Sequence, residues 1–275
     1  MKYCGNFSNK IDMQLFDEIA IVYQGQSKEL LTFLENYKGK KVTLEVKQEY
    51  LQEFHDGQTW KLINAIAERA PEVQLTVRFF APCKFDECDK ILEDCIQGLA
   101  VPFYFGFVIK DYDKLHYVCQ KGASEVYIGE ELCFDLARVT RVCMQYGVQI
   151  RTFPNVAQAS VRSGPALKKF FIRPEDVEEY SEYIDTLEFW GPLDRQVTLL
   201  RIYKGGTWFG DLNELILDLN TSLDSRTLVP VFAQARKNCQ RKCMKGGACS
   251  ICERLQSIGE KLGEQGYIIK TKKRH

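Results

Sequence analysis

Residues 124–156, SEVYIGEELCFDLARVTRVCMQYGVQIRTFPNV, decide the fold of this chain, because they spell out one strand–helix–strand unit. The runs that begin at Ser124 and Val148 are rich in Val, Ile and Tyr, and both predict β-strands. Between them, apolar residues recur at helical spacing from Phe134, and Gly147 marks the expected end of the helix. Two parallel strands need such a helical crossover, so the unit predicts a parallel sheet.

The same alternation continues on both sides of this unit. Further strands are predicted to begin at Glu18, Lys41, Val73, Pro102, Lys169 and Thr186, which makes eight with the two above. Helical periodicity fills most of the connections, at residues 27–37, 59–70, 88–99, 111–119, 134–147 and 174–184. Eight such units predict an α/β fold of the (β/α)8 TIM-like barrel type. An open α/β sheet is the alternative, although the chain lacks both G-x-G-x-x-G and the P-loop pattern.

The alternation stops after Pro192, and this suggests two parts, a (β/α)8-like barrel at 1–192 and a C-terminal appendix at 193–275. Residues 193–206 predict an additional strand or hairpin, and 211–220 predict a short helix. Two further helices carry cysteines, so we expect a helical, cysteine-rich appendix packed on the barrel.

Four cysteines lie close together in the appendix, in the run CQRKCMKGGACSIC with the spacing C-x3-C-x5-C-x2-C: Cys239, Cys243, Cys249 and Cys252. Zinc ribbons separate their two cysteine pairs by about 15–20 residues, a longer gap than this one. Compact four-cysteine runs are more typical of iron–sulfur clusters. The spacing therefore predicts a metal centre, a [4Fe–4S] cluster ahead of zinc, with four reduced cysteines on two amphipathic helices as the alternative.

Composition narrows the function classes. The formal net charge of the 275 residues is zero, so net charge does not indicate a nucleic-acid or membrane partner. No apolar run reaches the roughly 18 residues of a membrane-spanning helix. The first residues, MKYCGNFSNK, lack the apolar core of a secretory signal, and the chain has an odd number of cysteines, 11. We therefore expect a reducing, cytoplasmic setting. The sequence does not indicate the oligomeric state.

Charged and polar side chains recur within the predicted strands, where burial makes them costly unless they are paired or functional. The residues concerned are Glu45, Lys47, Arg78, Arg151, Asn155, Arg173 and Glu188. One interpretation is a pocket at the top of the barrel. Arg78, Arg151, Asn155 and Arg173 would bind an anionic substrate, and Glu45, Lys47 and Glu188 would be catalytic. The alternatives are a buried salt-bridge network that fills a barrel layer, or the opposite strand parity, which would place these side chains outside.

The stretch KFFIRPEDVEEYSEYIDTLEF, residues 169–189, together with the barrel rhythm over 18–192, resembles the collagenase-like peptidase family. That family includes prephenate-dependent RNA hydroxylases and the ubiquinone-biosynthesis proteins UbiU and UbiV. The resemblance implies a TIM-type barrel with a four-cysteine [4Fe–4S] cluster, and no role for an individual residue. The family's E-x-F-x-H-G signature does not occur here. Protease activity is not expected, since the chain has no recognisable nucleophile motif or histidine metal site.

These observations predict an iron–sulfur or zinc barrel enzyme that acts on an anionic small molecule or a modified biopolymer, with hydroxylase-like redox chemistry. A non-catalytic barrel, in which zinc fastens the appendix and the protein serves in interaction or assembly, is the alternative. Neither the substrate nor the reaction follows from the sequence.

Overall fold

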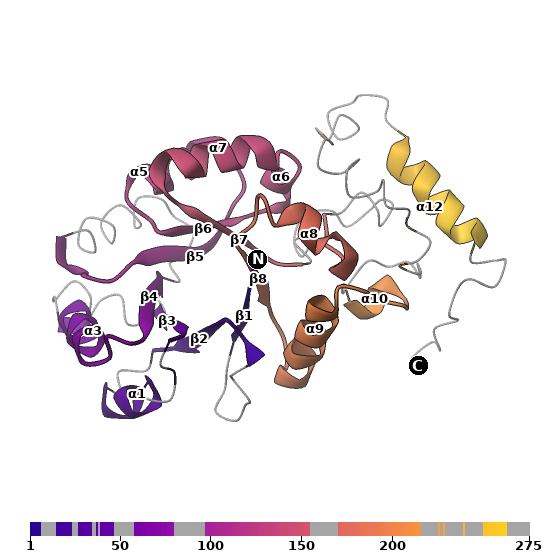
Figure 1. Ribbon diagram of the computed structural model, residues 1–275. Coiled ribbons are helices and arrows are strands. Elements are labelled where there is room, and N and C mark those ends of the chain that lie inside the picture. The colour runs from indigo at the N-terminus through magenta and orange to yellow at the C-terminus, as the bar shows by residue number, and fades with distance from the viewer. Residues whose placement is uncertain are drawn as a thin grey trace.

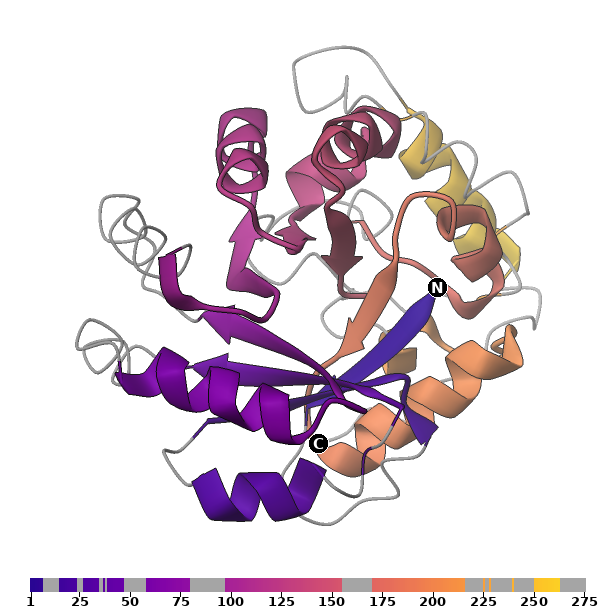
Figure 2. The same ribbon diagram turned by 60° about the vertical axis from the view of Figure 1, so that its left-hand side comes forward.

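The fold is centred on a parallel sheet of eight strands that closes into a barrel (Figures 1 and 2). The computed structural model describes residues 1–6, 15–23, 27–34, 37, 39–46, 58–79, 97–154, 170–215, 225, 228, 239 and 250–262. Each strand pairs with the next along the chain, and β8 pairs with β1. The strands are β1 Lys2–Asn6, β2 Glu18–Val22, β3 Lys41–Val46, β4 Gln74–Phe79, β5 Phe103–Ile109, β6 Glu125–Ile128, β7 Gln149–Thr152 and β8 Thr186–Phe189.

Helices surround the strands in both views (Figures 1 and 2). They are α1 Ser27–Leu34, α3 Gln58–Arg69, α5 Tyr112–Gln120, α6 Glu130–Cys133, α7 Leu136–Tyr146, η4 Pro174–Asp176, α8 Val177–Tyr180, α9 Leu193–Gly205, α10 Leu212–Leu215 and α12 Ile251–Leu262. The predicted α/β class and the TIM-barrel-like parallel sheet are thus confirmed. The connections at 47–57, 80–96 and 155–169 lie outside the described residues.

The strand–helix–strand unit quoted at the outset forms β6, α7 and β7. One part of it differs from the prediction. The chain leaves the sheet at Gly129, and the amides of Leu132 and Cys133 donate to the Gly129 carbonyl. Glu130–Cys133 is therefore the short helix α6, where we predicted a continuing strand. Gly147 ends α7 in the left-handed conformation, with a φ of +69°, as the sequence predicted.

Seven of the eight predicted strands are present, but the strand predicted to begin at Lys169 is not. Residues 2–6, which we did not predict, form β1 and close the barrel between β2 and β8. The run from Lys169 is not a strand, because Phe171 makes only an isolated bridge and Pro174 then begins η4. Phe170, Phe171 and Ile172 are all buried. An apolar run in the sequence indicates that the segment is buried. Burial alone does not distinguish a strand from an irregular buried segment.

Residues 193–206 also differ from the predicted strand or hairpin, since 193–205 form the helix α9. Its buried residues Leu199, Leu200 and Tyr203 follow helical spacing. The helix packs against β1 and β8, so the helical layer of the barrel extends beyond residue 192. Among the described helices, none combines the length and apolar character needed to cross a membrane.

Strand β3 shows how the core divides into two regions. Val42, Leu44 and Val46 are buried and belong to the hydrophobic core. Thr43 and Glu45 alternate with these three residues along the strand. They are also buried, but they are polar. Since successive strand residues point to opposite faces, the apolar core lies on the helical side of the sheet and the polar side chains fill the barrel lumen.

Candidate functional site

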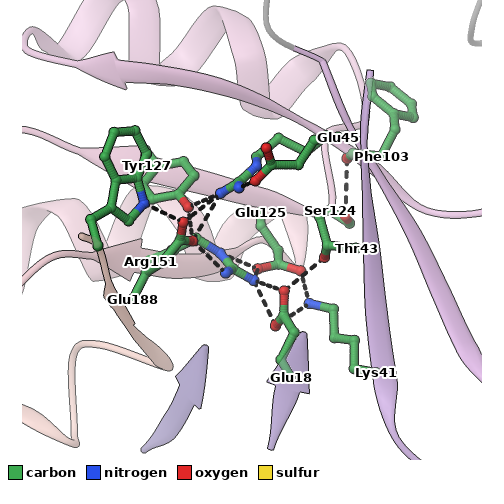
Figure 3. A network of polar contacts seen from close by, with 12 residues as sticks. Glu18, Lys41, Thr43, Glu45, Phe103, Ser124, Glu125, Tyr127, Arg151 and Glu188 are labelled. Atoms are coloured by element: carbon green, nitrogen blue, oxygen red, sulfur yellow. Dashed lines mark hydrogen bonds and ion pairs between the residues drawn. The ribbon is translucent and has the colours of Figure 1, made fainter. Parts of the chain in front are cut away.

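A network of ion pairs occupies the lumen of the barrel (Figure 3). Its charged members come from six strands: Glu18 on β2, Lys41 and Glu45 on β3, Arg78 on β4, Glu125 on β6, Arg151 on β7 and Glu188 on β8. All of them except Lys41 are buried. The network therefore connects most of the barrel through side chains that are distant in sequence.

Arg151 lies at the centre of this network, where its guanidinium group meets three carboxylates. Nη2 donates to Glu18 at 2.6 and 2.7 Å, and Nη1 donates to Glu188 at 3.0 Å. Nε and Nη2 both bond one oxygen of Glu125, at 2.9 and 2.6 Å. Burial by itself lowers the pKa of Arg151, but the surrounding carboxylates, including those of Glu18 and Glu125, outweigh burial and raise this pKa. The arginine is consequently held in its charged form.

Lys41, the first residue of β3, lies at the N-terminal end of the lumen. Its Nζ lies 3.2 Å from Glu18 and is also paired with Glu125. Thr43 Oγ1 donates a further hydrogen bond to Glu18 at 2.7 Å. Burial opposes ionisation of Glu18, yet the charges of Arg151 and Lys41 prevail and lower its pKa from 4.5 to about 2. Glu18 is therefore ionised at neutral pH.

At the C-terminal end, Arg78 connects two carboxylates. Its Nη1 donates to both oxygens of Glu188, at 2.7 and 2.9 Å, and its Nη2 is ion-paired with Glu45. Glu188 also accepts hydrogen bonds from the Tyr127 hydroxyl and, at 2.6 Å, from Trp190 Nε1. Glu45 is 9% exposed, whereas Glu188 is fully buried. Glu45 is thus the carboxylate of the network that solvent can reach most easily.

Three aromatic side chains, which we call the aromatic shelf, lie beside Glu188: Tyr127, Phe153 and Trp190. The rings of Tyr127 and Phe153 are stacked, with centroids 5.2 Å apart. Phe153 and Trp190 meet edge to face at 5.1 Å. Phe153 directly follows β7 and Trp190 directly follows β8, so the shelf stands at the C-terminal mouth of the barrel, where TIM-barrel enzymes have their active sites. Trp190 is 43% exposed.

Two further polar side chains, Cys4 and Tyr104, are buried in the lumen. Burial is the main cause that raises the pKa of each. The Tyr104 hydroxyl has no hydrogen-bond partner within the described part of the chain. The guanidinium group of Arg151 lies over the Tyr104 ring, with its central carbon 4.9 Å from the ring centroid. Both groups are therefore neutral at ordinary pH and add no charge to the network.

The charges of the described network do not cancel. Four carboxylates, those of Glu18, Glu45, Glu125 and Glu188, face three cations. Lys47, which the alternation along β3 would place next at the mouth, lies outside the described residues. Among the described carboxylates of the network, Glu45 is the most accessible to solvent.

Four of the residues singled out in the sequence are brought together in this network: Glu45, Arg78, Arg151 and Glu188. Their arrangement is a buried salt-bridge network, which was one of the interpretations left open. Asn155, like Lys47, lies outside the described residues. The sequence reasoning missed the network members Glu18, Lys41, Glu125, Tyr127 and Trp190. A signal for two of them existed, because Lys41 shares the strand parity of Glu45, and Trp190 that of Glu188.

Arg173 belongs to a different set of contacts. It forms a bidentate ion pair with Asp176, in which both N···O distances are 2.7 Å. Its Nη1 also donates to the carbonyl oxygens of Ser225 and Leu228, at 3.2 and 3.3 Å. These contacts attach a segment of the C-terminal part to the segment that leads into α8. The predicted role of Arg173 in substrate binding stays a prediction that these contacts do not favour.

Two of the four clustered cysteines are described. Cys239 and Cys252 are half-buried and pack against the edge of the hydrophobic core. Cys252 stands in the first turn of α12, which lies on the outside of the barrel in both views (Figures 1 and 2). Cys243 and Cys249 lie outside the described residues. Among the residues that are described, no group of three or more His, Cys, Asp or Glu could hold a metal ion. The metal centre stays a prediction.

Comparisons with known proteins yield likenesses of overall shape alone. No protein-family model matches the chain, and no curated protein matches it. Among solved structures, an aminoacrylate-bound tryptophan synthase from M. tuberculosis is similar, with 12% identity and a TM-score of 0.45, over 78% of this chain and 88% of that one. The tryptophan synthase subunit alpha from Campylobacter jejuni has 10% identity and a TM-score of 0.41, over 68% and 83%. Likenesses this low give no information about function.

Proposed function

We propose that this protein is an enzyme that performs acid–base chemistry at the C-terminal mouth of a complete (β/α)8 barrel, with Glu45 as the acid or base. Arg78 holds the Glu45 carboxylate in place through their ion pair. Glu188 in turn fixes Arg78 by accepting hydrogen bonds on both of its oxygens. A general acid or base needs such a fixed position and an accessible oxygen.

The observation that carries this proposal is the position of Glu45 near the C-terminal end of β3, where it is the most exposed carboxylate of the described network. Glu45 is 9% exposed, whereas Glu18 and Glu188 are fully buried. A carboxylate that an arginine holds in place and that solvent can reach is able to take up and release a proton.

The experiment is a comparison of wild-type protein with the Glu45→Gln variant in a metabolite mixture followed by mass spectrometry. We expect wild-type protein to deplete one small molecule with time, and Glu45→Gln to do so at least about 100-fold more slowly. Glu178→Gln, a change of an exposed carboxylate on α8, is the matched control. Equal turnover by the wild-type protein and Glu45→Gln would contradict the role of Glu45.

We also propose that Cys239, Cys243, Cys249 and Cys252 hold a metal centre in the appendix, a [4Fe–4S] cluster or, as the alternative, zinc. Support comes from their spacing in the sequence and from the position of Cys252 in the first turn of α12, where the helix dipole favours a thiolate. An iron–sulfur cluster would supply redox or Lewis-acid chemistry, as the resemblance to the collagenase-like peptidase family implies.

Elemental analysis of anaerobically purified protein tests the metal centre. We expect about four iron atoms per chain with visible absorbance, or one zinc ion without it. Cys239→Ser and Cys252→Ser should each lower the metal content, whereas Cys119→Ser, on α5, should leave it unchanged. Metal-free wild-type protein would remove this proposal and leave the acid–base proposal intact.

A non-catalytic barrel is the second candidate, and one observation favours it. Both lumen arginines that we predicted to bind an anionic substrate are already ion-paired with carboxylates of the protein. If the lumen only stabilises the fold, Glu45→Gln will alter no reaction. The four cysteines will then matter for assembly alone, and their serine variants will change the binding of a partner protein.

A further inference from the structure

We propose that Cys119 and Cys143 form a redox-sensitive pair, and that hydrogen peroxide oxidises the two thiols to a disulfide between α5 and α7. The two cysteines lie outside the Glu45 site and outside the predicted cysteine cluster. The inference is therefore independent of the proposed functions, and it adds a means of regulation to the barrel.

The first observation is the contact between the two thiols. Cys119 stands in the last turn of α5 and Cys143 in the last turn of α7, two helices that pack against each other (Figure 1). The two side chains hydrogen-bond to each other. Gln120 Nε2 also donates to the Tyr146 hydroxyl at 3.3 Å, which connects the same two helix ends. Two thiols in contact can form a disulfide with little movement of the backbone.

The second observation is that the pair is separate from the other buried cysteines that the structure describes. Cys119 and Cys143 belong to the hydrophobic core on the helical side of the sheet. Cys4 lies in the lumen, and Cys133 Sγ lies 3.9 Å from Thr152 Oγ1. Packing alone accounts for two buried cysteines, but it does not require that their sulfurs meet. The contact therefore favours a specific pair over two independent core residues.

The hydrogen bond makes the two thiols unequal. It lowers the pKa of Cys119, although burial opposes this effect, and it raises the pKa of Cys143 together with burial. Cys143 is thus the donor, and Cys119 is the acceptor. Because the thiolate is the reactive form of cysteine, Cys119 is the thiol that attacks the oxidant, and Cys143 is the thiol that completes the disulfide.

The position of the pair determines the size of the oxidant. Both thiols are buried, so a bulky disulfide such as oxidised glutathione cannot reach them in the folded protein. Both also stand in the last turn of a helix, and helix ends open locally more readily than helix interiors do. Hydrogen peroxide, which is little larger than water, fits this limited access.

The reaction consumes one peroxide and leaves two waters. The Cys119 thiolate attacks one peroxide oxygen, so that the S–O bond forms, the O–O bond breaks, and the departing hydroxide takes up the proton that Cys119 gave up. The Cys143 sulfur then attacks the Cys119 sulfur. The S–S bond forms and the S–O bond breaks, and the second hydroxide leaves with the Cys143 proton as water. Two thiols are oxidised, and the peroxide is reduced.

The disulfide would act on the unit that carries the centre of the lumen network. It would close a loop over residues 119–143, which contains β6 with Glu125 and Tyr127. Helix α7 leads directly into β7, which carries Arg151. A cross-link removes conformations from the unfolded chain, so we expect oxidation to stabilise this unit.

Peptide mapping by mass spectrometry under non-reducing conditions tests the inference on the reduced wild-type protein after peroxide treatment. We expect the tryptic peptides 115–121 and 142–151, which contain one cysteine each, to be recovered as a linked pair that dithiothreitol separates. The peroxide-treated protein should unfold at a temperature at least about 3 °C above that of peroxide-treated Cys119→Ser. Oxidised glutathione should give at least about tenfold less of the linked pair. Cys133→Ser, a change of a buried cysteine on α6, is the matched control and should still form the pair.

Two variants test the order of the steps. In Cys143→Ser the serine hydroxyl can still donate to Cys119, and we expect peroxide to leave a sulfenic acid on Cys119 that dimedone labels. In Cys119→Ser, dimedone should leave Cys143 unlabelled. Labelling of Cys143 in place of Cys119 would overturn the inference, and so would peptides that stay unlinked in the treated wild-type protein or that link to another cysteine. Since the mapping uses wild-type protein, it decides the inference even where a serine variant does not fold.

Discussion

Arg151 and Arg173 look alike in the sequence, since each follows an apolar residue in a run that predicts a strand, but the structure uses them in opposite ways. Arg151 is in the lumen and binds carboxylates from β2, β6 and β8. Arg173 pairs with Asp176, three residues further along the chain, and with two backbone carbonyls of the C-terminal part. The strand-like appearance was correct for β7 and wrong for the run around Arg173.

The difference teaches how the separation of partners along the chain limits what a sequence shows. The Arg173–Asp176 pair is local, and its spacing of three residues makes it recognisable in the sequence. Arg151 and Glu18 are 133 residues apart, and they meet only because the barrel closes. The charge of an arginine is visible in the sequence, but whether that charge is already neutralised depends on partners that folding brings from elsewhere.

Removal of Arg151 should have the largest effect. In Arg151→Met, Glu18, Glu125 and Glu188 lose their shared cation while they stay buried. We expect the free energy of unfolding, measured by urea denaturation at neutral pH, to fall by about 3–5 kcal/mol. Adding Glu18→Gln to this variant should restore part of the loss. A loss below about 1 kcal/mol would show that the lumen network is less tightly coupled than its geometry indicates.

Acid should weaken the lumen network next, through Glu18. Its pKa in the folded protein is lowered to about 2 from 4.5, so its stabilisation is complete above about pH 4.5 and is lost as the pH falls through about 2. The lowering corresponds to about 3 kcal/mol. We expect unfolding curves recorded between these pH values to show decreasing stability, and Glu18→Gln to flatten the decrease. An unchanged slope in Glu18→Gln would assign the acid sensitivity to another carboxylate.

The contacts of Arg173 should be worth less than those of Arg151. Arg173→Met leaves the buried Asp176 without its cation, but the change breaks one ion pair and two bonds to carbonyls. We expect a loss of about 2 kcal/mol in the free energy of unfolding. Limited proteolysis should also cut faster beyond residue 215, because Ser225 and Leu228 lose their attachment. Equal proteolysis of variant and wild type would separate Arg173 from the docking of this segment.

The smallest effect on stability is expected for Glu45→Gln, which removes the most exposed carboxylate of the described network. Arg78 keeps its two bonds to Glu188 in this variant. We expect the free energy of unfolding to stay within about 1 kcal/mol of the wild-type value. A loss as large as that of Arg151→Met would make Glu45 a structural partner of Arg78, and the acid–base role proposed for it would have to be abandoned.

Local patterns in the sequence predicted much of the fold. Seven of the eight strands and the helices α1, α3, α5 and α7 were found from the spacing of apolar residues. Strand β1 was missed because KYCGN is short and contains little apolar character. The run at 193–206 was misread because its valine, threonine and isoleucine suit a strand, although they lie on α9.

Sequence by itself determined which residues can be buried and which period they follow, because side-chain hydrophobicity and the geometry of helices and strands act over a few residues. It also provided every charge of the lumen. Only the tertiary structure decided which charges meet, since barrel closure sets the register that brings Glu18, Glu125 and Glu188 to one arginine. The electrostatic character of the mouth is a sum over these distant pairs, and no single strand carries that sum.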